Sequence, residues 1–110
     1  MSKRITPELL LGDIIESGEK ILRYTSDMTY EEFVSNEIII DAVIRNFEVI
    51  GEAANRLPDE FKDKYHEIDW HRIRGFRNRI VHDYAGIDIE IVWRIKDTFL
   101  LDMLEQIKKI

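Results

Sequence analysis

Cysteine is absent from this sequence of 110 residues, which excludes disulfide bonds and metal sites built from thiolates. The same absence is typical of a cytoplasmic protein, and the cytoplasm is the location we expect. No apolar run approaches the roughly 20 residues that a membrane-spanning helix requires. The first residues, MSKRITPELLLGD, lack the continuous apolar region of a secretory signal. We therefore expect a protein that has no membrane contact.

Positive charge is also in deficit, with 16 Lys and Arg against 22 Asp and Glu and a formal net charge of -6. A protein that binds nucleic acid without sequence preference is normally basic, because neutralised phosphates supply most of the affinity. Any contact with RNA must therefore come from a local patch. The hydrophobic share of 45% suits an ordinary globule, and the length argues for a single domain over residues 1–110.

Apolar residues recur at helical spacing through most of the chain, and the two prolines, Pro7 and Pro58, fall at expected helix ends. The pattern predicts helices over residues 6–25, 29–35, 36–57 and 69–83, one or two turns in 58–65, and a last helix from 88 to the C-terminal lysines. No segment alternates with a two-residue period between hairpin turns, so no sheet is expected. We predict an all-α fold, an up-and-down bundle of four to five helices.

The segment from residue 70 to residue 82, WHRIRGFRNRIVH, is the one strongly basic stretch. It contains Arg72, Arg74, Arg77 and Arg79, two histidines and no acid. Arg72, Arg74 and Arg79 are candidates for contact with RNA phosphates. The same three side chains would also suit the acidic face of a partner protein, or simply a solvated surface.

Arg77 lies beside the apolar stripe of its predicted helix. An arginine is costly to bury unpaired, so Arg77 must either meet an acid such as Glu48 or Glu52, or face a cleft that receives an anion. His82 lies about 140° round from Arg77 and roughly 7.5 Å further along an ideal helix. The two converge only if Arg77 reaches along the helix, if the helix ends near His82, or if a second copy closes the cleft. Asn78 is four residues from His82 and is placed to hydrogen-bond its ring.

An arginine and a histidine without metal ligands suit the cleavage of RNA. The RNA 2′-hydroxyl is itself a nucleophile, and a histidine can take its proton or protonate the leaving oxygen. An arginine stabilises the charge that develops on the phosphorus oxygens through paired hydrogen bonds. His66 and His71 are expected at the surface rather than in a metal site, and no cofactor is expected.

Residues 77–84, RNRIVHDY, match the pattern Arg, four residues, His, one residue, Tyr. This motif resembles the signature of the HepT toxins, a branch of the HEPN (higher eukaryote and prokaryote nucleotide-binding) superfamily. Residues 47–57, FEVIGEAANRL, and residues 87–93 in the last helix are also similar to that family. The resemblance covers most of the chain.

The resemblance implies a helical bundle that forms a homodimer, with the motif residues lining a cleft at the two-fold axis. Arg77 and His82 would be the residues of a metal-independent endoribonuclease, and Asn78 their polar companion. The implied partner is a minimal nucleotidyltransferase antitoxin (MNT), which neutralises such a toxin by transferring AMP to the motif tyrosine, here Tyr84. The added groups would block RNA by charge and by bulk.

Two other functions fit the same residues. In the first, the protein is a non-catalytic nucleotide- or substrate-binding partner of a nucleotidyltransferase, and Arg77 holds a phosphate that is never cleaved. In the second, it is a structural helical adaptor, and Arg77 is paired to an acid of its own chain.

Overall fold

The described part of the computed structural model comprises residues 5–82 and 86–110, with His82 described by its backbone alone. In it the chain forms the elements α1 (Pro7–Tyr24), α2 (Tyr30–Val34), α3 (Glu37–Arg56), α4 (Asp59–Lys64), α5 (Trp70–Arg74), α6 (Phe76–Ile80), β1 (Val81–His82), β2 (Gly86–Ile87), α7 (Ile89–Thr98) and α8 (Leu100–Lys108). The predicted all-α fold is confirmed. No helix in this part of the chain combines the length and apolar character needed to cross a membrane.

The first three helices begin where the sequence predicts, because each start has a side chain that satisfies free backbone N–H groups. The Thr6 hydroxyl accepts from the N–H of Leu9 at 3.2 Å, directly before the proline that opens α1. Thr29 and Glu32 form a reciprocal capping box at α2, with bonds of 2.9 and 3.1 Å. The local sequence therefore sets the ends of these helices before any packing is considered.

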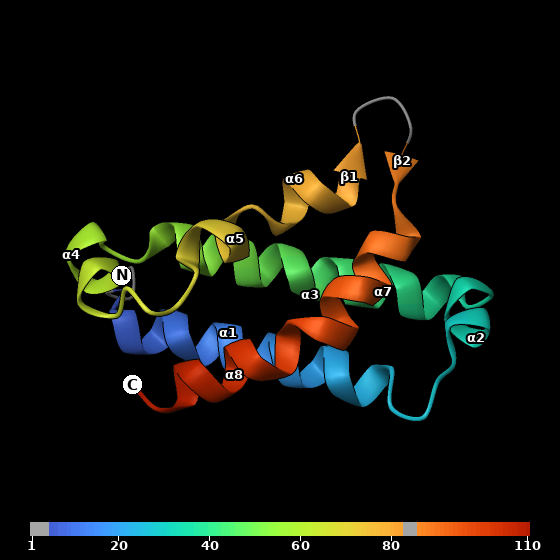
Figure 1. Cartoon of the computed structure of the whole chain (residues 1–110), viewed down its shortest axis with the longest axis horizontal. Helices are drawn as coiled ribbons and strands as arrows, with labels where there is room; N and C mark the ends of the chain where they lie inside the picture. Colours follow the sequence, from blue (N-terminus) through green and yellow to red (C-terminus); the bar gives the residue numbers. More distant parts are fainter. Residues whose placement is uncertain (1–4, 83–85) are drawn as a thin grey trace, which may run out of the picture.

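The bundle is built around the antiparallel pair α1 and α3, with α8 alongside α1 and the α5–α6 segment against α3 (Figure 1). Fully buried side chains from these helices, including Ile14, Phe47 and Leu104, form one continuous core. Glycine permits the close approach of α1 and α8, because a Cβ atom at Gly18 would lie 2.6 Å from a methyl carbon of Leu104.

The prediction of one helix over residues 69–83 is wrong. The helix is interrupted at Gly75 and ends at Ile80, after which Val81 is extended, with φ -104° and ψ 120°. β1 then pairs antiparallel with β2, Val81 opposite Ile87 and His82 opposite Gly86, so the prediction of no sheet is wrong for these residues. The β-branched side chain of Val81 favours the extended backbone, and Gly86 adopts a φ of +81°.

The last predicted helix is also divided, into α7 and α8, at Phe99. The backbone of Phe99 leaves helical geometry, with φ -123° and ψ -36°. Its ring packs edge to face against Phe76, with ring centroids 5.7 Å apart. The bend therefore turns this ring toward α6, a requirement of tertiary packing that helical periodicity does not reveal.

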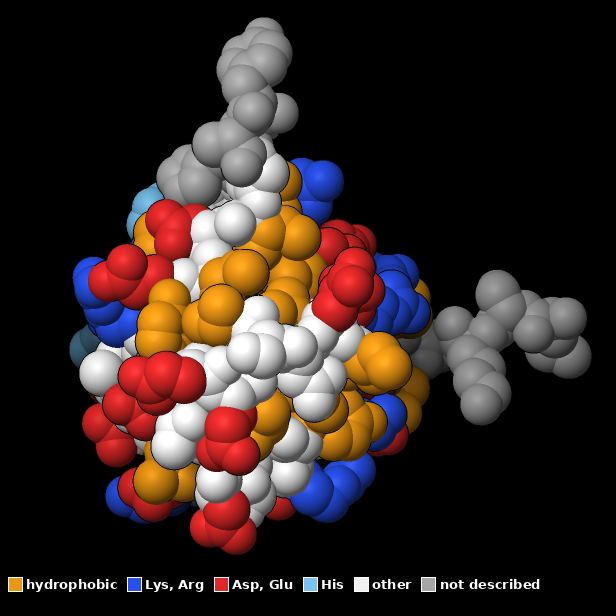
Figure 2. Space-filling model, turned by 90° about the vertical axis from the view of Figure 1, so that its right-hand side faces the viewer, with side chains coloured by type: hydrophobic (Ala, Val, Ile, Leu, Met, Phe, Trp, Pro, Cys, Tyr) orange, Lys and Arg blue, Asp and Glu red, His pale blue; other side chains and the backbone are white. Residues whose placement is uncertain are grey.

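Hydrophobic and acidic side chains meet at the end of the bundle that carries α2. Figure 2 looks onto the end that carries α2, where hydrophobic side chains gather among acidic ones. A hollow there is lined by Glu31, Glu32 and Glu37 together with Ile38, whose side chain is 81% exposed. The basic side chains of the α5–α6 segment do not line this hollow.

Candidate functional site

Helix α6 is the element that presents the motif arginine. Phe76 and Ile80 are buried and anchor the helix, and Phe76 contacts Phe47 edge to face at 5.3 Å. The three residues between them, Arg77, Asn78 and Arg79, are all exposed. A short helix anchored at both ends therefore projects three consecutive polar side chains in different directions.

Arg77 lines a groove of about 350 Å³ between α1, α3 and α6, which we call the Arg77 groove. Its lining comprises Leu10, Asp13, Arg45, Glu48, Val49, Glu52, Ala53, Arg56 and Arg77. Three carboxylates and three guanidinium groups thus share one hollow. Among the described residues none of these six groups forms an ion pair or a side-chain hydrogen bond.

Of the two alternatives for Arg77, the pairing with Glu48 or Glu52 is absent among the described residues, although both acids line the same groove. Glu48 is half-buried and Glu52 is exposed, so water can solvate both carboxylates. Within the described residues, Arg77 thus shares its groove with carboxylates but has no fixed partner. This state corresponds to the other alternative from the sequence, an arginine that faces a cleft.

A second hollow, of about 660 Å³, lies on the other side of α6, and we call it the basic pocket. It is lined by Asn55, Asp69, His71, Arg72, Arg74, Gly75, Asn78 and Arg79. The structure therefore separates Asn78 from Arg77, two residues that the sequence places in one catalytic group. It brings together Arg72, Arg74 and Arg79, the three that the sequence marks for RNA contact.

The expected helical register between Asn78 and His82 is also wrong, because α6 ends at Ile80 and His82 belongs to β1. Asn78 forms no side-chain hydrogen bond in the described part of the chain. The sequence allowed three ways for Arg77 and His82 to converge. One of these conditions is met, because the helix ends close to His82. The side chain of His82 lies outside the described residues, as does Tyr84.

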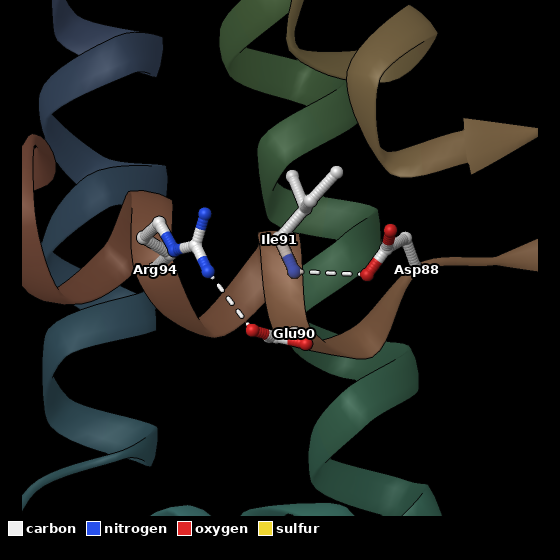
Figure 3. Close-up of polar contacts among 4 residues, drawn as sticks. All are labelled: Asp88, Glu90, Ile91 and Arg94. Carbon is white, nitrogen blue, oxygen red and sulfur yellow. Dashed lines mark hydrogen bonds and ion pairs between the residues drawn. The ribbon is translucent and has the colours of Figure 1, made fainter.

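Asp88 marks the start of the helix that follows the hairpin. Its carboxylate accepts from the N–H of Ile91 at 3.1 Å, and Glu90 pairs with Arg94 at 2.8 Å one turn further on (Figure 3). The N–H of Asp88 donates to the carbonyl of Ile80 at 2.8 Å, which ties the start of α7 to the end of α6. The strand that carries the backbone of His82 is therefore held at both of its ends.

Arg72 is held by an aromatic ring rather than by an acid. The carbon at the centre of its guanidinium group lies 4.2 Å from the centroid of Phe99, a distance typical of a cation–π contact. Its Nε is buried and has no hydrogen-bond partner. Stacking therefore orients the guanidinium plane at the edge of the basic pocket.

His66 and His71 are exposed, as the sequence predicts, and the two tryptophans make structural contacts. The indole N–H of Trp70 donates to the carbonyl of Tyr65 at 3.0 Å, and Trp93 packs against Phe33 with centroids 5.1 Å apart. Among the side chains that the structure describes, no group of three or more His, Asp and Glu could hold a metal ion.

Sequence reasoning missed Arg45 and Arg56 in the Arg77 groove and the contact of Phe99 with Arg72. Arg45, Glu48, Glu52 and Arg56 lie three or four residues apart and so share one face of α3, a signal that was available. No comparable signal exists for Phe99 under Arg72, because the two residues are distant in the chain. The charged face of α3 could have been found from the local sequence, whereas the contact of Phe99 with Arg72 depends on how the chain folds.

These features define a class of protein: an all-α bundle in which a short helix presents an unpaired arginine just before a strand that carries a histidine. The chain belongs to the ribonuclease HepT-like family, whose family model matches residues 14–110. The resemblance to the HepT branch of the HEPN superfamily is thereby confirmed.

The relatives carry ribonuclease names. The chain is 40% identical to "Putative RNase MJ1380" of Methanocaldococcus jannaschii over 95 residues, 86% of each chain. It is 30% identical to "Putative RNase TTE0752" of Caldanaerobacter subterraneus over 105 residues, 96% of this chain and 94% of the other. It is 36% identical to "Probable ribonuclease HepT" of Thermococcus cleftensis over 84 residues, 76% of each chain. No solved structure matches the chain significantly.

Proposed function

We propose that this protein is a metal-independent endoribonuclease, the toxin of a toxin–antitoxin pair, which cleaves RNA in a cleft shared by two protomers. Membership of the ribonuclease HepT-like family and the names of the relatives support the class of activity. The geometry of Arg77 supports the choice of residue. Each part of the proposal has its own test.

The observation that carries the proposal is the unpaired state of Arg77. Its groove contains Glu48 and Glu52, yet Arg77 forms no ion pair in the described part of the chain. Arg77 is exposed, so water can solvate its guanidinium group without a fixed partner. An exposed arginine that no acid holds is available to a phosphate, which it can bind through paired hydrogen bonds.

The proposed reaction is a transesterification of RNA. The 2′-hydroxyl oxygen attacks the adjacent phosphorus, the bond from phosphorus to the 5′ oxygen breaks, and the products are a 2′,3′-cyclic phosphate and a 5′-hydroxyl. His82 transfers the proton, either from the attacking 2′ oxygen or to the leaving 5′ oxygen, and water completes the exchange. Arg77 stabilises the added charge on the phosphoryl oxygens.

The homodimer is proposed because the two motif residues stand on different elements. Arg77 lines a groove against α1 and α3, whereas the backbone of His82 lies on β1, beyond the end of α6. A second copy would bring its own arginine and histidine to the same cleft. Sedimentation equilibrium at micromolar concentration should give a dimer mass, and a monomer alone would contradict this part.

Neutralisation is proposed to occur through Tyr84. The cognate minimal nucleotidyltransferase transfers AMP from ATP to the tyrosine hydroxyl and releases pyrophosphate. The new phosphodiester brings negative charge next to the motif and repels RNA. Co-expression with the transferase should raise the mass of the wild-type chain by one or more AMP units and leave Tyr84→Phe unchanged.

The decisive test is cleavage of single-stranded RNA in EDTA by wild type, Arg77→Ala and His82→Ala. Arg94→Ala is the matched control, since Arg94 is exposed and pairs with Glu90 away from both hollows. Wild type and the control should cut, and the two motif variants should not. If wild type binds RNA or ATP but leaves RNA intact, the protein is instead the non-catalytic partner of a nucleotidyltransferase.

A further inference from the structure

The basic pocket concentrates positive charge on a protein whose net charge is -6. Arg72, Arg74 and Arg79 line it together with His71, against the single acid Asp69. The Oδ1 atom of Asp69 already accepts the N–H of Arg72 at 3.0 Å as the cap of α5. The pocket therefore has little negative charge of its own to offset its arginines.

None of these three arginines forms an ion pair within the described residues. Arg72 lies over the ring of Phe99, and a terminal guanidinium nitrogen of Arg74 lies 3.4 Å from Nδ1 of His71. Basic groups that the fold holds close together repel one another unless an anion joins them. The cluster thus has the character of an anion site.

The lining of the pocket matches a sugar–phosphate backbone. The amides of Asn55 and Asn78 can bond to phosphate and sugar oxygens, and backbone contacts of this kind position a strand without reading its sequence. The volume of about 660 Å³ is within the range of sites that hold small organic ligands. A hollow of this size has room for part of a nucleic-acid strand, not only for a single ion.

The position of the pocket relative to Arg77 determines what can fill it. Arg77, Asn78 and Arg79 are consecutive on α6, yet Arg77 lines one hollow and the other two line the second. Consecutive side chains of a helix point about 100° apart, so Arg77 and the two residues after it reach different hollows. A lone mononucleotide would place its phosphate in one hollow, whereas a strand carries phosphates to both.

We propose that the basic pocket binds the sugar–phosphate backbone of the RNA strand beside the phosphate that Arg77 contacts. The inference rests on the proposed ribonuclease function and extends it to a second subsite. Arg74 and Arg79 contact the flanking phosphates, and Arg72 is a positioning residue whose orientation Phe99 sets. Asn78 belongs to this strand-binding subsite and not to the group around Arg77.

The test measures binding separately from cleavage. A single-stranded oligonucleotide with 2′-O-methyl sugars cannot undergo the transesterification, so its affinity can be measured by fluorescence anisotropy over a range of salt concentrations. The variant Arg74→Gln/Arg79→Gln is compared with Arg23→Gln/Arg94→Gln. Both pairs remove two exposed arginines, but Arg23 and Arg94 line neither hollow.

The pocket variant should bind the oligonucleotide at least about tenfold more weakly than wild type, because a bond to a charged group contributes that much. The slope of log affinity against log salt should fall in magnitude by about 1.4, since each phosphate contact on a single strand contributes about 0.7. The control pair should change both quantities much less. For a dinucleotide, which has one bridging phosphate, the affinities of wild type and the pocket variant should differ only slightly.

Equal binding by the pocket variant and the control would overturn the proposal. So would a pocket variant that keeps its RNA affinity but no longer binds the nucleotidyltransferase, because the pocket would then belong to the protein partner. Failure of the ribonuclease proposal looks different. Wild type would leave ordinary RNA uncut, while the binding difference on the 2′-O-methyl strand would still be present.

Discussion

The two hollows beside α6 differ in charge although adjacent residues of one short helix line both. The Arg77 groove contains three carboxylates and three arginines, whereas the basic pocket contains three arginines, a histidine and one acid that is used as a helix cap. The difference comes from the neighbours. Residues of α1 and α3 line the Arg77 groove together with α6, whereas residues of α5 line most of the basic pocket with α6. The same helix can therefore present one arginine for chemistry and another for strand binding.

The largest effect should come from removing the side chain that holds α6 in place. Phe76 is fully buried between Phe47 and Phe99, so Phe76→Ala should lower the free energy of unfolding by about 3–5 kcal/mol. Both hollows should be lost together. Urea unfolding measures the change, with the half-buried Phe61→Ala as the milder control. An equal loss in the two variants would show that Phe76 has no special role.

Replacement of Arg77 should affect cleavage and leave the fold intact. Arg77→Ala should reduce the rate of RNA cleavage about 100- to 1000-fold, the usual cost of one lost donor to a developing oxyanion. Arg77→Lys should recover little of that rate, because an ammonium group cannot form the paired hydrogen bonds of a guanidinium. Single-turnover cleavage in EDTA tests both variants. Full activity of the lysine variant would mean that charge alone is required.

The stacking of Arg72 on Phe99 should be measurable as a coupling energy. In a double-mutant cycle of Arg72→Gln and Phe99→Leu, the two changes should be non-additive by about 0.5–1 kcal/mol in the free energy of unfolding. The single variant Phe99→Leu should also weaken binding of the 2′-O-methyl strand, since Arg72 loses its orientation. If the two changes were strictly additive, Phe99 would not orient Arg72.

The smallest effect should follow removal of the acid in the basic pocket. Asp69→Asn keeps a side chain that caps a helix well, so stability should hardly change. The affinity for the 2′-O-methyl strand should rise between about 1.5-fold and fivefold, the range for one screened charge. Asp41→Asn, an exposed acid of α3 that lines neither hollow, is the matched control. An equal rise in both would reflect net charge alone.

Much of this protein was predictable because the relevant signals are local. Thr6, Thr29 and Asn36 cap helices through bonds to residues three positions away, and such bonds depend on little beyond the neighbouring sequence. The motif of Arg77 and His82 and the family to which it belongs were likewise evident from spacing.

Only the tertiary structure decided how the motif is divided in space. Helical periodicity predicts one helix that continues through Gly75 and Ile80. The helix is instead interrupted at Gly75, and after Ile80 the chain forms the strand β1. Packing against α3 and pairing with β2 outweigh the weak local preference for helix. The end of α6 at Ile80 removes the helical register between Asn78 and His82. Phe99 reaches Arg72 for the same reason, since contacts between distant residues depend on how the bundle closes and not on sequence spacing.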